Sequence, residues 1–169
     1  MTSELALSQL HVTEVPWFDP DAEALRAAMA REVGPRYSAR VSTADRAATN
    51  AVDPTSVFLT VVVYTAAGAT DKREAVGHAA LRWNGDDLEL KRMFVTVEHR
   101  GTGVSTALLS TVEDSARKAG RPRLILQTGD RQPDAVRLYE KSGYSRIPNF
   151  SPYEILPFSN CYEKVFDHG

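Results

Sequence analysis

The chain has 169 residues, of which 43% are hydrophobic and 25% charged, which excludes a disordered or fibrous protein and fits one globular domain. Lys and Arg total 20 against 22 Asp and Glu, so no overall positive charge favours nucleic acid or an anionic membrane. A single cysteine, Cys161, excludes an internal disulfide and a cysteine-based zinc site.

The N-terminal third predicts one strand followed by one or two helices. Residues 7–15 alternate loosely between polar and apolar and indicate a strand. Asp19 followed by Pro20 is typical of a helix start, since an N-cap residue precedes proline at the first helical position. This helix is expected to end at Gly34, and residues 42–50 are interpreted as a short second helix.

The middle of the chain predicts three antiparallel strands. Residues 57–65 are rich in β-branched side chains and indicate a buried strand, and residues 74–83 form the next strand. The Asn-Gly-Asp-Asp sequence at 84–87 is a hairpin signal, and residues 88–97 supply the third strand.

The second half alternates between helices and strands. Apolar residues from Val104 to Ala119 follow the spacing of one helix face, residues 124–127 indicate a short buried strand, and residues 133–142 a second helix. This order implies a parallel crossover within a mixed sheet. Two final strands and the proline-rich loop between them are expected at residues 144–147, 161–166 and 148–157.

A glycine turn between a strand and a helix is the most informative segment. Residues 100–105 read Arg-Gly-Thr-Gly-Val-Ser and lead directly into the predicted helix. The first N–H groups of a helix lack partners, so this turn predicts an anion site suited to a diphosphate. The nucleotide-hydrolase loop would need a following Lys, and the dinucleotide fingerprint a third glycine. The alternative is that Gly101 and Gly103 only build a tight turn.

Two motifs, in order, resemble the GNAT superfamily of acyl-CoA-dependent N-acetyltransferases. Residues 100–105 resemble its Q/R-x-x-G-x-G/A motif, although Ser105 replaces the small Gly or Ala. Residues 135–144, AVRLYEKSGY, resemble its A-x-x-L-Y-E-x-x-G-F/Y segment, and Gln132 stands where the family often has Asn. The resemblance covers roughly residues 57–166.

The resemblance implies an α/β (α+β) fold: a mixed, mostly antiparallel sheet of about six to seven strands, flanked by helices, with one splayed parallel pair. Residues 1–169 then form a single domain. Its cofactor core lies at about 57–145, and its acceptor-side elements at about 17–50 and 146–160.

The resemblance also implies acetyl-CoA as cosubstrate and gives residues for binding it. The main chain of the fourth strand would bind pantetheine, and one of its amides could stabilise the thioester oxyanion. The glycine turn would bind the diphosphate, and Gln132 would lie near pantetheine. The expected cofactor-binding residues are Met93, Phe94, Val95, Arg100, Gly101, Thr102, Gly103, Val104, Ser105 and Gln132.

Two side chains are expected to act in catalysis. Tyr139 matches the family tyrosine that protonates the departing CoA thiolate; the alternative is an aromatic that only packs in the core. Glu89 lies on the fourth strand where several family members carry a catalytic carboxylate, and an amine with a pKa of about 10.4 needs a base. The alternative is that Glu89 only pairs with Lys91 or binds the substrate cation. Alternation along the strand predicts that Glu89, Lys91 and Met93 share one face.

The implied function is transfer of an acetyl group from acetyl-CoA to a primary amine by direct attack in a ternary complex. The acceptor could be a small molecule, an amino acid or a peptide. Phe150, Tyr153 and Phe158 are candidates for its pocket; the alternative is that these aromatics only pack the loop against the domain. The alternatives are a non-catalytic acyl-CoA-binding module and an interaction protein that has lost the cofactor. We expect no bound metal, since the four histidines lack zinc-type spacing. We also expect no nucleic-acid or membrane partner, since the chain has no overall positive charge. With no signal peptide evident, a cytoplasmic location is expected, with a homodimer as an option.

Overall fold

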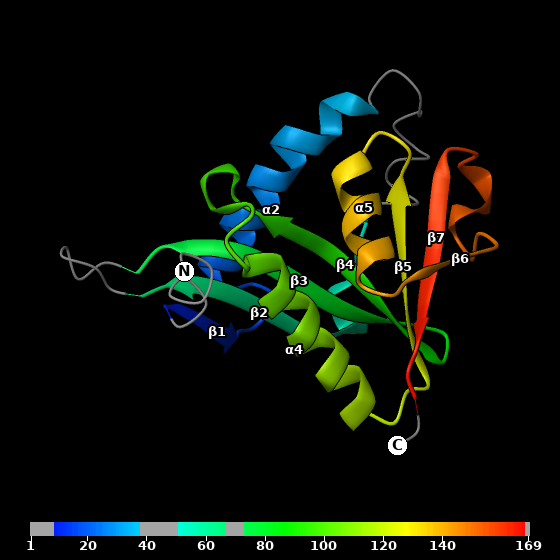
Figure 1. Cartoon of the computed structure of the whole chain (residues 1–169), viewed down its shortest axis with the longest axis horizontal. Helices are drawn as coiled ribbons and strands as arrows, with labels where there is room; N and C mark the ends of the chain where they lie inside the picture. Colours follow the sequence, from blue (N-terminus) through cyan, green and yellow to red (C-terminus); the bar gives the residue numbers. More distant parts are fainter. Residues whose placement is uncertain (1–8, 38–50, 67–72, 168–169) are drawn as a thin grey trace.

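The computed structural model describes residues 9–37, 51–66 and 73–167, which build one seven-stranded sheet in the order β1-β2-β3-β4-β5-β7-β6 (Figure 1). Only β4 and β5 run parallel; all other neighbours are antiparallel. The strands are β1 (Leu10–Glu14), β2 (Val57–Thr65), β3 (Ala75–Asn84), β4 (Asp87–Val95), β5 (Arg123–Gly129), β6 (Ser145–Ile147) and β7 (Ser159–Val165). The main helices are α2 (Pro20–Val33), α4 (Val104–Lys118) and α5 (Pro133–Lys141). The predicted mixed sheet with helices is therefore confirmed.

Helix α2 begins as its sequence predicts. The Asp19 carboxylate accepts hydrogen bonds from the N–H groups of Asp21 and Ala22, at 3.0 and 3.1 Å, and Pro20 occupies the first turn. This cap satisfies donors that a helix start leaves unpaired. The second helix expected at 42–50 lies outside the described residues.

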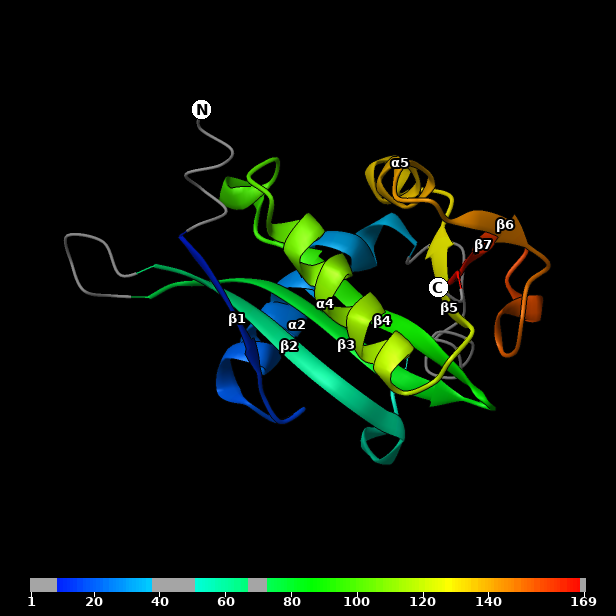
Figure 2. The ribbon, with the colours of Figure 1, turned by 60° about the horizontal axis from the view of Figure 1, so that its bottom comes forward.

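Helices α2 and α4 cover opposite faces of the sheet (Figure 2). On β2, Val61 and Val63 pack in the larger core with α4, whereas Val62 packs with α2, because successive strand residues face opposite sides. Within the part of the chain that the structure describes, no helix is both long and apolar enough to cross a bilayer.

A bulge interrupts β4 and corrects one expectation. His78 pairs with Phe94 and Ala80 with Lys91, so β4 carries one more residue than β3 between these pairs. Arg92 lies in this segment with a φ of 54°, a value unusual for a residue other than glycine. Because of the extra residue, Met93 packs in the α4-side core instead of sharing a face with Glu89 and Lys91, as the alternation predicts.

Strands β4 and β5 pair over a short distance and then diverge. Residues 88–90 pair with residues 124–126, after which β4 follows β3 and β5 follows β7 (Figure 1). The splayed parallel pair expected from the sequence is present. It leaves the last part of β4 without a strand neighbour on its β5 side.

Candidate active site

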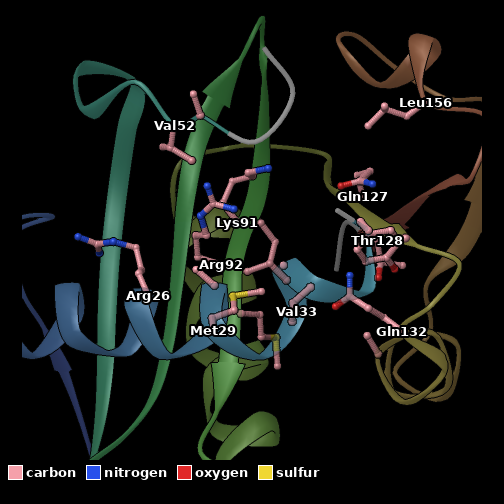
Figure 3. A pocket seen from close by; sticks show the side chains of 18 of the residues that line it. Arg26, Met29, Val33, Val52, Lys91, Arg92, Gln127, Thr128, Gln132 and Leu156 are labelled. Atoms are coloured by element: carbon pink, nitrogen blue, oxygen red, sulfur yellow. The ribbon is translucent and has the colours of Figure 1, made fainter. Parts of the chain in front are cut away.

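A cavity of about 790 Å³ opens where β4 and β5 diverge (Figure 3). Its walls come from α2, the second half of β4, the end of β5, the start and middle of α5, and the segment around Leu156 and Phe158. The cavity therefore brings together segments that lie far apart in the sequence, including Ala135 and Tyr139 of the second motif but no residue of the glycine turn.

The glycine turn lies directly after β4, at the start of α4. Gly101 and Gly103 have φ values of 78° and 95°, which glycine adopts without steric cost. Gly103 is the N-cap of α4 and supplies no side chain, so the helix start is left for a ligand to cap. The local geometry fits the predicted diphosphate site.

Arg100 is held by protein groups on both sides of this turn. Its Nη2 lies 2.8 and 2.7 Å from the two carboxylate oxygens of Glu32 on α2, and its Nε donates to the Val95 carbonyl at 3.0 Å. Glu32 offsets part of the Arg100 charge. An anion at this turn would therefore depend mainly on the main-chain N–H groups.

The β5 side of the cavity carries a polar side chain without a partner. The Thr128 Oγ1 atom is buried and has no hydrogen-bond partner among the described residues. Gln132, the residue before α5, lines the same cavity, as Figure 3 shows. A buried hydroxyl without a partner is unfavourable, so this wall is suited to a ligand with amide groups, such as pantetheine.

Tyr139 lies on α5 and lines the cavity with only 7% of its surface exposed. Its ring packs edge to face against Tyr144, with 5.7 Å between the ring centroids. No described side chain or carbonyl hydrogen-bonds to its hydroxyl. Burial raises the Tyr139 pKa, so the phenol stays protonated at neutral pH.

Glu89 is fully buried in a hydrogen-bonded cluster and does not line the cavity. Its carboxylate accepts hydrogen bonds from Arg82 Nε at 3.0 Å, Asn84 Nδ2 at 3.1 Å and the Tyr153 hydroxyl at 2.6 Å. Lys91 does line the cavity, and its Nζ donates to the same Tyr153 hydroxyl at 2.7 Å. Glu89 is therefore connected to the cavity through Tyr153 and Lys91.

The pKa of Lys91 is lowered within this cluster. Burial is the largest cause of a Lys91 pKa lowered to about 8. The Glu89 carboxylate, 3.8 Å away, opposes this change, whereas Arg92 and Arg82 add to it. A lysine with this pKa exchanges its proton within the range in which enzymes are usually assayed.

His78 supports the bulge from β3. Its Nδ1 lies 2.7 Å from the Arg92 carbonyl, and its Nε2 lies 2.9 Å from Nη1 of Arg26 on α2. A neutral ring satisfies both contacts by donating from Nδ1 and accepting at Nε2. Burial, chiefly, lowers the His78 pKa from 6.5 to about 4, which keeps the ring neutral.

We expect His78 to make the fold sensitive to mild acid. Because its folded pKa lies below its unfolded value, the unfolded chain binds the proton first, and stability falls as pH decreases from 6.5 toward 4. The expected loss in unfolding free energy between pH 7 and pH 5 is about 2 kcal/mol. Urea unfolding at both pH values measures it. His78→Gln should lose clearly less over the same interval; an equal loss would assign the effect to other groups.

Comparison with known proteins assigns the family. A family model described as the acetyltransferase (GNAT) family matches residues 22–144. The chain belongs to the GNAT family. An IAA acetyltransferase of Azospirillum brasilense is 40% identical over 88 residues, which cover 52% of this chain and 58% of that protein. An acetyltransferase of Agrobacterium fabrum is 34% identical over 91 residues, covering 54% and 62%. The chain thus spans about three fifths of the length of these curated relatives.

Solved structures of GNAT proteins share the fold over almost the whole chain. A Klebsiella pneumoniae structure described as an acyl-CoA N-acyltransferase has a TM-score of 0.74 and 27% identity, covering 95% of this chain and 99% of that one. A GNAT acetyltransferase of Elizabethkingia anophelis, solved with acetyl-CoA bound, has a TM-score of 0.63 and 14% identity, covering 94% and 99%. At 14% identity, the similarity to the Elizabethkingia anophelis structure establishes the fold alone.

The residues expected from the GNAT motifs are only partly gathered at the cavity. Met93, Gln132 and Tyr139 line it, and the glycine turn follows the strand that forms its wall. The Phe94 side chain packs toward α2 and that of Val95 toward α4, which leaves only their main chain for a ligand. Thr128 and Arg26 also line the cavity, although no sequence motif points to them.

Proposed function

We propose that this chain is an acetyl-CoA-dependent N-acetyltransferase that acts on a primary amine. The observation that carries the proposal is the Tyr139 hydroxyl, which makes no hydrogen bond to the described residues and lies beside a cavity formed by the splayed β4 and β5. A turn suited to a diphosphate follows the same β4 strand. As part of this proposal, the chain is one domain, works in the cytoplasm and is able to form a homodimer.

The cosubstrate would be held along β4 and the start of α4. The main-chain N–H groups of residues 101–105 would bind the diphosphate. The main chain of residues 93–95 would bind pantetheine, with Thr128 and Gln132 facing it from β5 and α5. Acetyl-CoA supplies a thioester whose carbonyl carbon an amine can attack and whose thiolate can leave.

Tyr139 would give its phenolic proton to the departing sulfur. A thiol has an ordinary pKa of about 8.5, so the thiolate is already a good leaving group and its departure needs only modest help from the Tyr139 proton. A main-chain N–H of β4 would stabilise the negative charge that develops on the carbonyl oxygen. The remaining step is removal of a proton from the amine, for which we propose that Glu89 acts through Tyr153 and Lys91.

The role of Glu89 is tested by Glu89→Gln. We expect kcat to fall by roughly 100-fold and the pH–rate profile to change, because a general base typically contributes 10²- to 10⁴-fold. Glu163→Gln is the matched control, since Glu163 on β7 pairs with Arg123 at 3.0 Å and does not line the cavity. Variants are compared after calorimetry has shown that they bind CoA. A wild-type pH–rate profile in Glu89→Gln would reject the base role.

Release of the free CoA thiol in the presence of a panel of primary amines tests the function itself. We expect release that depends on both the amine and acetyl-CoA. CoA binding without thiol release from any amine would favour the non-catalytic acyl-CoA-binding module. Absence of a thermal shift with CoA would favour an interaction protein.

A further inference from the structure

One wall of the cavity consists mainly of apolar side chains. They come from α2 and the residues just before it, from the segment that precedes β2 and from the segment that precedes β7, and Figure 3 labels four of them. The larger apolar residues of this wall are Trp17, Met29, Val33, Val52, Leu156 and Phe158. Among the described lining residues of these segments, Arg26 is the only charged one.

Hydrogen bonds place the Leu156 side of this wall beside Lys91. Tyr153, three residues before Leu156, accepts a hydrogen bond from Lys91 Nζ at 2.7 Å and donates one to Glu89 at 2.6 Å. Leu156 is itself only 7% exposed. The Leu156 segment therefore adjoins the cluster through which we propose that the proton of the amine leaves.

Val52 lies at the same level of the sheet. The carbonyl of its neighbour Ala51 accepts a hydrogen bond from Arg82 Nη1 at 3.5 Å, and Arg82 pairs in register with Glu89 across β3 and β4. Val52 and Leu156 therefore both wall the part of the cavity that is close to the Glu89 cluster.

This part of the cavity is remote from the glycine turn. A strand rises about 3.3 Å per residue, so Lys91 lies roughly 10–13 Å from Val95 at the end of β4, and the glycine turn follows beyond. A cosubstrate with its diphosphate at that turn would reach the Lys91 region only with its acyl end. The apolar wall is therefore better placed for the second substrate.

The charged groups near this wall already have partners within the protein. Lys91 binds the Tyr153 hydroxyl and lies 3.8 Å from Glu89, whereas Arg26 donates to the Trp17 carbonyl and stacks on the Trp17 indole at 3.6 Å. No Asp or Glu is among the described residues that line the cavity. A second ammonium group on the acceptor would therefore lose its hydration without gaining a carboxylate partner, which is unfavourable.

We propose that the acceptor is a primary monoamine with an apolar body of several carbons, and that Val52, Leu156 and Phe158 bind this body. The inference rests on the proposed acetyltransferase function and defines the acceptor class. Burial of apolar surface would supply the affinity. The Phe158 ring is held in the wall by stacking on Tyr37, with 5.5 Å between the ring centroids.

A binding measurement tests the inference without turnover. Calorimetry on the protein saturated with CoA compares N-hexylacetamide with N-(5-aminopentyl)acetamide, which have the same length and differ only in a terminal methyl or ammonium group. We expect N-hexylacetamide to bind at least about tenfold more tightly, because the ammonium must be desolvated without a partner. Equal affinity, or tighter binding of the aminopentyl compound, would overturn the proposal.

Chain length gives a second measure of the same wall. From N-ethylacetamide through N-butylacetamide to N-hexylacetamide, affinity should rise by up to about fourfold for each methylene group that becomes buried. An affinity that does not change along this series would show that the alkyl chain stays in solvent, and would contradict the proposal.

Two variants assign the effect to the apolar wall. Val52→Asp adds a carboxylate, so the preference for N-hexylacetamide should fall at least about tenfold or reverse. Leu156→Ala removes apolar contact and should weaken N-hexylacetamide severalfold, while both variants still bind CoA. Val165→Asp, at an exposed position of β7 outside the cavity, should keep the wild-type preference. Wild-type affinities in both wall variants would reject the assignment.

Turnover separates this inference from the proposed function. Thiol release is compared for hexan-1-amine and pentane-1,5-diamine, and kcat/KM should favour hexan-1-amine at least about tenfold. Release with both amines and no preference would overturn the inference and leave the acetyltransferase proposal standing. Tighter binding of N-hexylacetamide without thiol release from any amine would support the apolar site and overturn the proposed activity.

Discussion

Replacing Tyr139 by phenylalanine is expected to lower kcat by roughly 10- to 1000-fold, the range over which general acid catalysis contributes. The substitution removes one oxygen atom that makes no hydrogen bond to any described residue, and it keeps the ring that packs on Tyr144. Folding and CoA affinity should therefore change little. Steady-state kinetics with acetyl-CoA, together with calorimetry for CoA, measure both quantities.

Tyr144→Phe provides the matched control for this experiment. Tyr144 contacts the same ring but donates its hydroxyl to Glu113 at 2.9 Å, away from the cavity lining. Its loss leaves a buried carboxylate with one partner fewer, so stability should fall by about 1–3 kcal/mol while kcat is retained. The opposite pattern, with unchanged kcat in Tyr139→Phe, would reject Tyr139 as the acid.

A methyl group added at Gly77 is expected to disturb the start of α4. An alanine Cβ there would lie 2.5 Å from Val104 Cγ1 and 3.2 Å from Leu108 Cδ1. Valine in a helix has one strongly preferred rotamer, so the helix itself must shift. We expect Gly77→Ala to cost about 1–3 kcal/mol of stability and to weaken CoA binding by roughly tenfold. Thermal unfolding and calorimetry measure these effects.

A second substitution tests whether the clash is the cause. Val104→Ala alone opens a small cavity and should also destabilise the chain. In the double variant the two changes offset one another, so its stability and CoA affinity should exceed those of Gly77→Ala. Additive losses would mean that Gly77 acts by some route other than its contact with Val104.

The sequence predicts the parts of this site that depend on neighbouring residues. The Asp19 cap, the glycine turn and the amphipathic face of α4 are each encoded within a few positions, and the structure contains all three. The splayed parallel strands also follow from the family resemblance. The cap, the turn and the helix face need only local patterns, whereas the splay follows from the order of the elements and the family resemblance.

The bulge of β4 could not be predicted because it depends on pairing between strands. Nothing in the sequence around Arg92 distinguishes a bulge from a continuous strand; only the register against His78 and Ala80 reveals it. The expected alternation of Glu89, Lys91 and Met93 was wrong for this reason. The bulge lies within the stretch of β4, residues 90–93, that lines the cavity.

The hydrogen-bond partners of Glu89 also could not be predicted from neighbouring residues in the sequence. Its shortest hydrogen bond comes from Tyr153, which is 64 positions away, within the proline-rich loop. The sequence left Tyr153 open between the acceptor pocket and loop packing, and gave pairing with Lys91 as an alternative role for Glu89. The structure joins these three residues in one cluster, and Tyr153 rather than Lys91 makes the short contact.

A crystal structure of the protein with CoA tests most directly whether the start of α4 binds the diphosphate. We predict diphosphate oxygens within about 3 Å of main-chain nitrogens in residues 101–105, with pantetheine between β4 and β5. Density that places the diphosphate elsewhere, or well-folded protein that takes up no CoA, would contradict the account.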